Sequence, residues 1–472
     1  MNCRLGYTAA TLLACAITLG GCSKSTWSLD PTGMATLLGK SITLASATYS
    51  VAYNGNGYTG GSAPSDANIY GGGDTVTVLA NTGSLVRTNY DFRGWNTRAD
   101  GLGIDYIPGS TFILGSSDLT LYAIWTPFFA GGDGTAGNPY QVSMASQLNH
   151  VRDYPGAHYI QTADIDLNVA PYNTGNGWDP IGDTTPQFVG TYDGNGYAIT
   201  SLYINRPAEN NVGLFGYSNG AVLRNIVLDA AIVTGYDNVG SLVGYNTSVS
   251  LATPSSVGNP LIGNCSSSGV TVTGHNNVGG LVGYNWGSSN PAYASVIENC
   301  FATGSVNASG TDIGGLVGIN VYYGTISKCY TQVSVTGVTF TGGMTGYTSY
   351  GGVIYNSYAT GSVMGTTGVG GLSGFTENNS GTVTRCYSAC LVSGSVNFGG
   401  LNGQGGTSLI SSYYDTDLCG LTDSDRGTPT TTGNMVLQAT FAGWDFGSTW
   451  QIDGGVSYPY LQWQGGINIP YP

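Results

Sequence analysis

A short glycine-bracketed apolar motif recurs seven times between residues 211 and 403, and this repetition limits the possible folds more than any other feature of the chain. Two consecutive copies read NVGSLVGY and NVGGLVGY, and four of the six spacings between closing glycines are 28 or 29 residues. A fixed period of this size is typical of a solenoid, in which each unit buries its apolar face only against its neighbours. The closing glycines are Gly216, Gly244, Gly283, Gly318, Gly346, Gly374 and Gly403.

A second repeat lies between the glycine motifs, in segments such as IENCFATGSV and ISKCYTQVSV. Strand alternation sends Cys300, Ala302 and Val306 to one side and Phe301 and Ser305 to the other. The small and apolar set should face the core, so that similar residues stack about 4.8 Å apart from coil to coil. The core column predicted by this alignment holds Cys265, Cys300, Cys329, Ser357, Cys386 and Tyr413.

These motifs, with residues such as Gly280-Leu281-Val282-Gly283, resemble the GLUG-motif family over about residues 133–465. The resemblance implies a right-handed parallel β-helix, found in bacterial adhesin-like surface proteins and in some immunoglobulin A-specific metallopeptidases. The peptidase function does not transfer, because the chain has no His-Glu-x-x-His motif among its three histidines. We divide this region into an N-terminal cap (133–210), repeats (211–419) and a C-terminal cap (420–465).

Residues 48–126 form a separate predicted unit of short strands joined by tight Asn-Gly and Asp-Gly turns. The segments Phe92–Thr97 (FRGWNT) and Leu121–Trp125 (LYAIW) resemble the Listeria–Bacteroides repeat, the internalin B-repeat. That resemblance implies a small β-grasp domain that serves as a spacer or adhesion module. We expect Trp95 and Trp125 to be core or half-buried aromatics. The predicted fold class is therefore all-β, a β-helix preceded by a β-grasp-like domain, with a linker at residues 127–132.

The first 21 residues have the pattern of an export signal, with Arg4 before an apolar run. Leu19-Gly20-Gly21-Cys22 then resembles a bacterial lipobox, which implies lipidation of Cys22. Ser23 at the next position resembles the default for outer-membrane lipoproteins. We therefore predict a lipoprotein signal peptide (1–21), a tether (22–47) and a cell-envelope location, at the outer membrane or the cell surface.

Two coils are longer than the others, because they carry extra residues at 246–260 and 285–294 that are rich in Ser, Pro, Gly and Asn. Insertions in a solenoid leave the core as loops on one edge, which is frequently the binding edge. The chain ends in an aromatic tail from Trp444 to Trp463. We expect this tail to cover the open last coil, since an exposed strand edge invites aggregation.

An aromatic residue follows the core column in each coil and should face outward. The row is a candidate platform for sugar rings, although mutual stacking of the rings that stiffens the sheet is the interpretation we favour. Trp286, in the second insertion, is a further candidate. Asn264, Asn299 and Asn356 precede the column and are expected to form a structural amide ladder. The row consists of Phe301, Tyr330, Tyr358, Tyr387 and Tyr414.

Cysteines of an exported protein can pair as disulfides. Stacked side chains hold their Cβ atoms near 4.8 Å, however, beyond the roughly 3.5–4.5 Å that a disulfide prefers. We therefore favour buried free thiols, while the redox state of each cysteine stays open at this point. The cysteines concerned are Cys265, Cys300, Cys329, Cys386, Cys390 and Cys419.

The net charge of -14 argues against nucleic acid as a partner, because phosphate binding needs clustered Lys and Arg. The outward rows are Ser, Thr, Gln and Tyr, which supply no general base. We expect no enzyme activity, no cofactor and no metal site. The favoured hypothesis is a lipid-anchored binding or structural protein with a glycan or protein ligand, adhesin-like in role. The alternative is a carbohydrate-active β-helix enzyme, a polysaccharide lyase or hydrolase.

Overall fold

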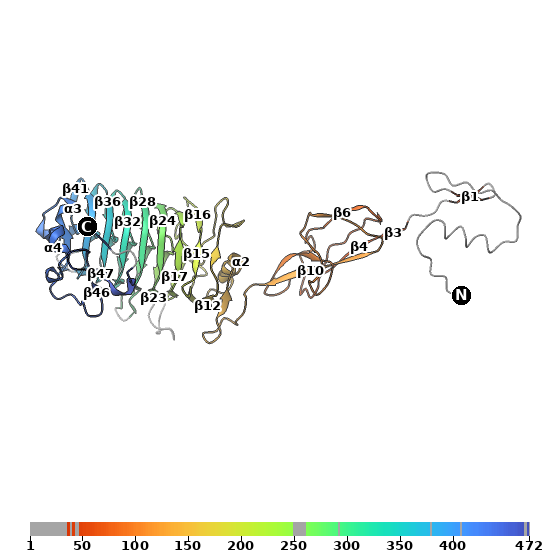
Figure 1. The fold of residues 1–472 in the computed structure, drawn as a ribbon, viewed down its shortest axis with the longest axis horizontal. Helices are drawn as coiled ribbons and strands as arrows, with labels where there is room; N and C mark the ends of the chain where they lie inside the picture. Colours follow the sequence, from red (N-terminus) through yellow and green to blue (C-terminus); the bar gives the residue numbers. More distant parts are fainter. Residues whose placement is uncertain are drawn as a thin grey trace. The chain divides into compact units, whose positions relative to one another are not determined.

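The chain divides into two compact units, Met1–Pro127 and Phe128–Pro472 (Figure 1). The predicted signal peptide, Cys22 and most of the tether lie outside the described residues. The computed structural model describes residues 47–248, 261–290, 293–377, 380–405, 408–466 and 470–471, with the backbone of β1 (Ala35–Leu37) and β2 (Lys40–Ile42).

The first unit is a small mixed β domain without a helix between residues 47 and 127. Its main sheet has the order β4-β10-β7-β8, in which β4 and β10 are parallel and the other neighbours antiparallel. Trp95 is fully buried and donates its indole N–H to the Leu79 carbonyl at 2.9 Å, and Trp125 is half-buried, as predicted. The strands are β3 (Thr48–Tyr49), β4 (Val51–Asn54), β5 (Tyr70–Gly71), β6 (Thr75–Thr77), β7 (Tyr90–Asn96), β8 (Asp105–Tyr106), β9 (Thr111–Ile113) and β10 (Leu119–Pro127).

The second unit is a parallel β-helix, which confirms the predicted architecture. Each complete coil contributes strands to four sheets in turn, and all neighbours within these sheets are parallel (Figure 1). The unit begins at Phe128 and not after a linker, since Phe129 is buried in the core and stacks on Tyr140 at 4.3 Å.

The first two sheets run the length of the unit. The first sheet holds β11 (Tyr140–Val142), β12 (His158–Gln161), β14 (Thr191–Asp193), β18 (Val222–Arg224), β23 (Leu261–Gly263), β27 (Val296–Glu298), β31 (Thr325–Ser327), β35 (Val353–Tyr355), β39 (Thr382–Thr384) and β43 (Leu409–Ile410). The second sheet holds β13 (Ile165–Asp166), β15 (Ala198–Thr200), β16 (Tyr203–Asn205), β19 (Val227–Asp229), β20 (Ile232–Thr234), β24 (Ser266–Gly274), β28 (Phe301–Ala308), β32 (Tyr330–Thr336), β36 (Tyr358–Met364), β40 (Tyr387–Ser393), β44 (Tyr413–Asp415) and β45 (Thr428–Thr430).

The other two sheets are shorter, and the named helical segments lie near the two ends of the unit. The third sheet holds β21 (Val239–Gly240), β25 (Val278–Gly279), β29 (Thr311–Gly314), β33 (Thr339–Gly342), β37 (Thr367–Gly370) and β41 (Val396–Gly399). The fourth sheet holds β17 (Phe215–Asn219), β22 (Val243–Thr247), β26 (Val282–Trp286), β30 (Val317–Val321), β34 (Thr345–Thr348), β38 (Ser373–Thr376) and β42 (Asn402–Gly405). The helical segments are α2 (Ala145–Asn149), η1 (His150–Asp153), α3 (Thr416–Cys419), η3 (Ser424–Arg426), α4 (Thr432–Met435), η4 (Gln438–Thr440) and η5 (Gln462–Gln464).

The glycine motifs carry the chain from the third sheet to the fourth. A Cβ atom on Gly283 would lie 2.5 Å from the carbonyl carbon of Asn238, and one on Gly318 would lie 2.5 Å from that of Asn277. Only glycine allows the backbones of adjacent coils to come this close. The glycine motif therefore recurs once per coil, at the position where the backbones of adjacent coils touch.

An amide ladder occupies the turn between the first and second sheets. Asn264 donates to Asn225 at 3.2 Å, and Asn299 donates to Asn264 at 3.1 Å. These residues take left-handed backbone conformations, which asparagine tolerates. The predicted ladder is confirmed for Asn264 and Asn299, and Asn356 takes the same conformation with φ 50°.

A second amide ladder stands in the turn that enters the third sheet. Asn238 donates to Asn211 at 2.8 Å, and Asn277 donates to Asn238 at 2.7 Å. In the next coil this position is Asp312, whose backbone is also left-handed. The Oδ1 atom of Asp312 is buried without a hydrogen-bond partner, and burial raises the pKa of this carboxyl to about 6.

The cysteine column lies inside the β-helix, and its thiols are free and buried, as favoured from the sequence. The Cys265 amide donates to Cys300 Sγ and the Cys300 amide to Cys329 Sγ, both at 3.4 Å. Further along the column, Ser357 and Ser412 accept equivalent bonds. The assignment of Tyr413 to this column was wrong by one residue, because Thr384 pairs with Ile410 and Ser412 therefore follows Cys386.

Candidate functional site

The predicted aromatic row does stack along the outer side of the second sheet. The ring centroids of Phe301 and Tyr330 are 4.8 Å apart, those of Tyr330 and Tyr358 are 5.2 Å apart, and those of Tyr358 and Tyr387 are 4.9 Å apart. The rings lie within 9° of parallel. The interpretation of mutual stacking is therefore correct.

Phe301 is half-buried, but the other three stacked rings are buried, and the sugar-platform alternative was wrong for them. Tyr330, Tyr358 and Tyr387 have at most 1% of their surface exposed. They are covered by residues 432–464, which we call the C-terminal strap and which include β46 (Trp450–Gln451) and β47 (Tyr460–Leu461). Figure 1 draws the strap in dark blue across the coils.

Hydrogen bonds fix the strap to several coils in succession. The Tyr387 hydroxyl donates to the Pro459 carbonyl at 2.7 Å, and the Tyr358 hydroxyl donates to Gln464 Oε1 at 3.0 Å. The indole of Trp463 donates to the Lys328 carbonyl at 2.8 Å. The aromatic tail thus covers a flank of the β-helix, whereas we had expected it to cover the open last coil.

Tyr414 does not belong to the outward row. The strand pairing places Tyr413 after Tyr387, while Tyr414 pairs with Ser388 and points into the core. Tyr414 is fully buried, and its hydroxyl donates to the Asp423 carbonyl at 3.0 Å. The two adjacent tyrosines allowed either register, and the sequence alignment chose the wrong one.

An exposed aromatic stack lies elsewhere, at the corner where the chain leaves the fourth sheet for the first. The ring centroids of Trp286 and Tyr322 are 4.7 Å apart, and those of Tyr322 and Tyr350 are 4.9 Å apart. Tyr350 is 52% exposed and the neighbouring Tyr323 is 38% exposed. We call Trp286, Tyr322, Tyr323 and Tyr350 the aromatic corner.

The backbone of the aromatic corner is unusual. Tyr322, Tyr323 and Tyr350 have φ values of 52°, 61° and 47°. Bulky residues rarely adopt this left-handed region, where each costs of order 1–3 kcal/mol, and such strain concentrates at functional sites. Three strained tyrosines in adjacent coils make this corner the leading candidate for a binding site.

Buried amides support the corner from beneath. Asn246 donates to Asn285 Oδ1 at 2.8 Å, and Asn285 donates to Asn320 Oδ1 at 2.8 Å. Asn320 in turn donates to the Gly324 carbonyl at 2.9 Å, which closes the turn that carries Tyr322 and Tyr323. Because these amides are fully hydrogen-bonded and out of solvent, they hold the rings in one arrangement.

Both sequence insertions leave the β-helix at the same junction, between β22 and β23 and between β26 and β27. The expectation that they share one edge is therefore confirmed for their described parts. The sequence pointed to Trp286 but missed Tyr322, Tyr323 and Tyr350. The sequence did contain a pattern that could have identified these tyrosines. In successive coils, an aromatic residue follows the closing glycine of the motif after a short and nearly constant interval.

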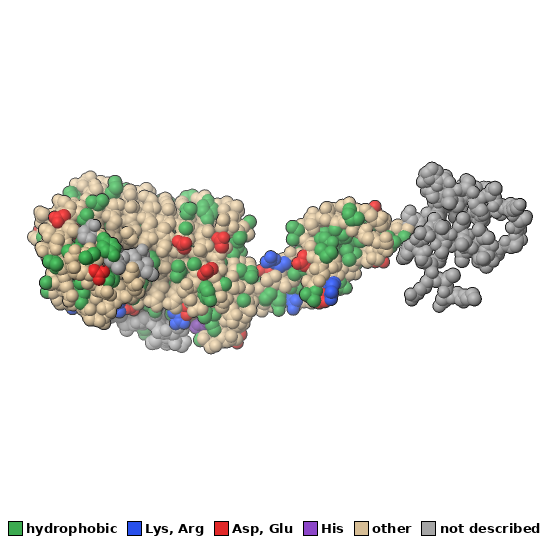
Figure 2. Space-filling model, viewed as in Figure 1, with side chains coloured by type: hydrophobic (Ala, Val, Ile, Leu, Met, Phe, Trp, Pro, Cys, Tyr) green, Lys and Arg blue, Asp and Glu red, His purple; other side chains and the backbone are tan. Residues whose placement is uncertain are grey.

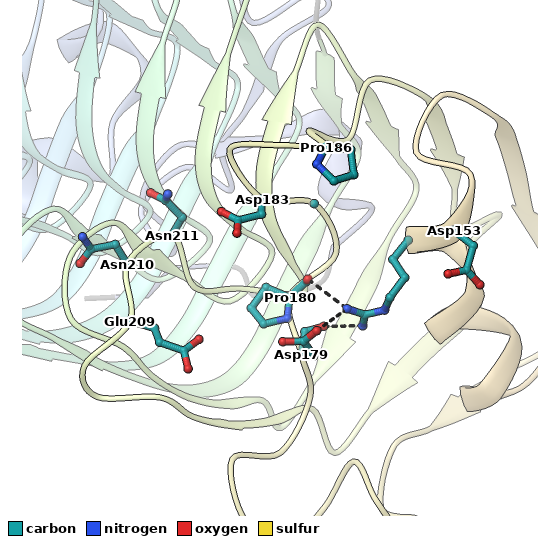
Figure 3. A pocket seen from close by; sticks show the side chains of 10 residues that line it. Asp153, Asp179, Pro180, Asp183, Pro186, Glu209, Asn210 and Asn211 are labelled. Carbon is teal, nitrogen blue, oxygen red and sulfur yellow. Dashed lines mark hydrogen bonds and ion pairs between the residues drawn. The ribbon is translucent and has the colours of Figure 1, made fainter.

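A hollow of about 370 Å³ lies near the N-terminal cap and is lined by several acidic residues (Figure 3). Arg152 donates to the carboxylate of Asp179 at 2.6 Å, and Arg206 lies 3.0 Å from both Asp179 and Glu209. The two arginines thus pair with Asp179 and Glu209, and these ion pairs connect separate segments of the N-terminal cap. Among the described residues, no group of three or more His, Cys, Asp or Glu side chains is placed to hold a metal ion.

The buried thiols lead to a test of the fold. Burial raises the pKa of Cys386 and of Cys390 to about 12, and it raises the pKa of Cys265 and Cys300 well above the usual value. The thiolate is the reactive form. We expect a thiol reagent to label the half-buried Cys419 fastest among these residues under native conditions at neutral pH.

Peptide mapping of the labelled protein by mass spectrometry would measure this order. Addition of denaturant should then label all of the core thiols at similar rates. Fast native labelling of Cys300 would contradict the buried column.

Two stretches of the chain match known families. Residues 49–124 match the Listeria-Bacteroides repeat domain, and residues 274–307 match the GLUG motif. Both resemblances seen in the sequence are confirmed in these stretches.

The curated relatives share only part of their length with the chain. A candidate Gly-rich membrane protein of Evansella cellulosilytica is 44% identical over 128 residues, which are 26% of this chain and 15% of the relative. Halomucin of Haloquadratum walsbyi is 36% identical over 122 residues, 24% of this chain and 1% of that protein. The chain therefore spans a small fraction of the relatives it matches.

One solved structure that matches this chain is a candidate immunoglobulin A1 protease from Bacteroides ovatus. It is 21% identical, with a TM-score of 0.47, and the match covers 71% of this chain and 96% of that chain. A second structure, an IgA1 protease, is 17% identical with a TM-score of 0.39, covering 62% of this chain and 22% of that chain.

Proposed function

We propose that the chain is a cell-envelope protein, lipid-anchored through Cys22, with an adhesin-like binding role and no catalytic activity. The observation that carries this proposal is the aromatic corner, an exposed and strained aromatic surface held on a rigid scaffold. Binding surfaces benefit from such preorganisation, because little freedom is lost when the ligand arrives.

The names of relatives give independent support for an envelope location. Two matching proteins of Evansella cellulosilytica are named as candidate membrane proteins, the second being 45% identical over 78 residues. No helix among the described residues is long and apolar enough to cross a membrane. An N-terminal lipid would supply the attachment, at about 0.8 kcal/mol per buried CH₂.

A direct test of the binding role uses the purified chain with polysaccharides and with surface-protein extracts. We expect capture of a ligand without chemical change to it. Release of reducing ends or of unsaturated sugars would instead identify a polysaccharide hydrolase or lyase. Cleavage of a captured protein would likewise refute the non-catalytic role.

The anchor makes a separate prediction. In cells fed a labelled fatty acid, the wild-type chain should incorporate label and sediment with membranes, whereas Cys22→Ser should do neither. Cys15→Ser, which changes a cysteine inside the predicted leader, is the matched control and should keep the label. Labelling of the Cys22→Ser variant would refute lipidation at this residue.

A further inference from the structure

We infer that the aromatic corner binds an uncharged glycan, with a sugar ring on the exposed face of Tyr350 and a sugar hydroxyl on the carboxylate of Glu377. This inference rests on the proposed binding function and names the class of ligand. Three observations support it: the exposure of the Tyr350 ring, the charge around the corner, and the pairing of the neighbouring strands on both of their edges.

Tyr350 is the ring most open to a ligand. Trp286, Tyr322 and Tyr350 stack within 14° of parallel, so the inner faces of these rings are occupied by one another. Tyr350 is the last ring of the stack, and its one ring contact among the described residues is with Tyr322. The electron-rich face of an aromatic ring attracts the weakly positive C–H groups on the face of a sugar ring.

A carboxylate lies beside this ring. The Glu377 Oε2 atom accepts the Tyr350 amide at 3.3 Å and also accepts the Ser380 hydroxyl. These bonds hold the carboxylate next to the platform. Carboxylates are strong acceptors for hydroxyl donors, which every neutral sugar carries in number.

The charge of the corner selects among glycans. The described residues of the turns between the fourth and first sheets, where the corner lies, carry one charged side chain, that of Glu377. These turns comprise residues 218–221, 246–248, 285–290, 293–295, 320–324, 348–352, 376–377, 380–381, 405 and 408. The whole chain carries a net charge of -14, and Figure 2 shows few Lys or Arg side chains on the visible face of the β-helix. Acidic polysaccharides would be repelled, so the expected ligand is uncharged.

The corner is a poor site for a peptide. The strands that lead into it, β30, β34 and β38, are each paired on both sides, so no free edge can accept a peptide strand. The large hydrophobic residues exposed in the described part of the corner are Tyr323 and Tyr350, with no aliphatic partner to form a pocket. Rings with hydroxyl groups and no aliphatic pocket suit a ligand that is itself rich in hydroxyls.

The test is affinity electrophoresis and calorimetry of the purified full chain with soluble neutral polysaccharides, namely a β-glucan, a mannan and a galactan, and with alginate as the acidic comparison. We expect at least one neutral polymer to bind and alginate not to bind. Tyr350→Ala should weaken binding about tenfold, and Tyr350→Phe should keep most of it, because the ring and its face remain.

Tyr236→Ala is the matched control. Tyr236 is 45% exposed and stacks on His275 at 4.7 Å, at a different corner of the same β-helix. This variant should bind as the wild type does. Circular dichroism and thermal unfolding of each variant would confirm that the fold is kept. Glu377→Gln is a second, independent test, because it should also weaken binding although it removes no ring.

The outcomes separate this inference from the proposed function. Binding of a neutral glycan that neither Tyr350→Ala nor Glu377→Gln weakens would overturn the site and leave the binding role intact. Equal or tighter binding of alginate, or capture of proteins alone, would overturn the ligand class. Degradation of the polysaccharide would overturn the proposed function itself.

Discussion

Replacing Trp450 by alanine is expected to destabilise the β-helix by about 3–5 kcal/mol, the usual cost of removing a large buried aromatic side chain. Trp450 is fully buried at the centre of the C-terminal strap. Its ring lies 4.5 Å from that of Trp444 and 6.2 Å from those of Tyr358 and Tyr387. The substitution would open a cavity between the strap and the tyrosine row and let water reach the row.

Urea or thermal unfolding followed by tyrosine and tryptophan fluorescence would measure this loss. Trp450→Phe is the informative partner, since the indole N–H of Trp450 is buried without a hydrogen-bond partner and its removal relieves an unsatisfied donor. We expect Trp450→Phe to cost much less than Trp450→Ala. Trp463→Ala, at a 36% exposed position in the strap, should also cost much less. Equal effects for Trp450→Ala and Trp463→Ala would mean that the strap is not a packed part of the fold.

Asp312→Asn is expected to stabilise the β-helix at neutral pH by about 2–3 kcal/mol. Asp312 occupies the position after Asn277 in the second amide ladder, where each new residue donates to the one before it. An ionised carboxylate has no proton to donate, and its Oδ1 atom is buried without a partner. Asparagine supplies an amide donor at this position and removes the buried charge.

The effect should depend on pH in a defined direction. The carboxyl pKa is about 6 in the folded chain and 3.8 ordinarily, so the folded state holds the proton more tightly. The stability that this group contributes is therefore present below about pH 3.8, falls as the pH rises and is lost above about pH 6. Tyr284 and Tyr347 face this carboxylate, and burial raises the pKa of both phenols, so they stay neutral throughout the range.

Unfolding midpoints of the wild type and of Asp312→Asn at about pH 4 and about pH 7.5 would test this linkage. The difference between the two proteins should be small at the acidic pH and large at the neutral one. Asp229→Asn, which makes the same change of charge on an exposed strand residue, controls for net charge. A stabilisation by Asp312→Asn that is the same at both pH values would refute the buried-charge explanation.

The coil architecture could be predicted because each coil must meet the same packing requirements at equivalent positions. Gly283 and Gly318 must be glycine where two backbones touch, and the Cys300 and Cys329 thiols fill equivalent core positions. Such constraints recur at a fixed spacing and are therefore visible in the sequence. The last coil was misaligned because Tyr413 and Tyr414 are adjacent and either could continue the row.

What the sequence could not show depends on contacts between distant segments. Alternation correctly placed Tyr358 on the outer side of its sheet, but its cover is the strap, which lies about a hundred residues later, as the bond to Gln464 shows. The aromatic corner was also hidden, because left-handed tyrosines such as Tyr322 and Tyr350 violate the usual preferences of their residue type. Trp286 alone was suggested, through its place in an insertion.

The strap follows the coils in the sequence, so it is synthesised after them. Neighbouring coils of a solenoid can assemble as soon as they are available, and chains fold from their N-terminal parts during synthesis. A chain that stops before residue 432 would therefore carry a complete row of stacked tyrosines on its surface with nothing to cover it. Until the strap docks, this aromatic flank is an exposed apolar patch of the kind that promotes aggregation, so the last segment made is the one that completes the soluble surface of the β-helix.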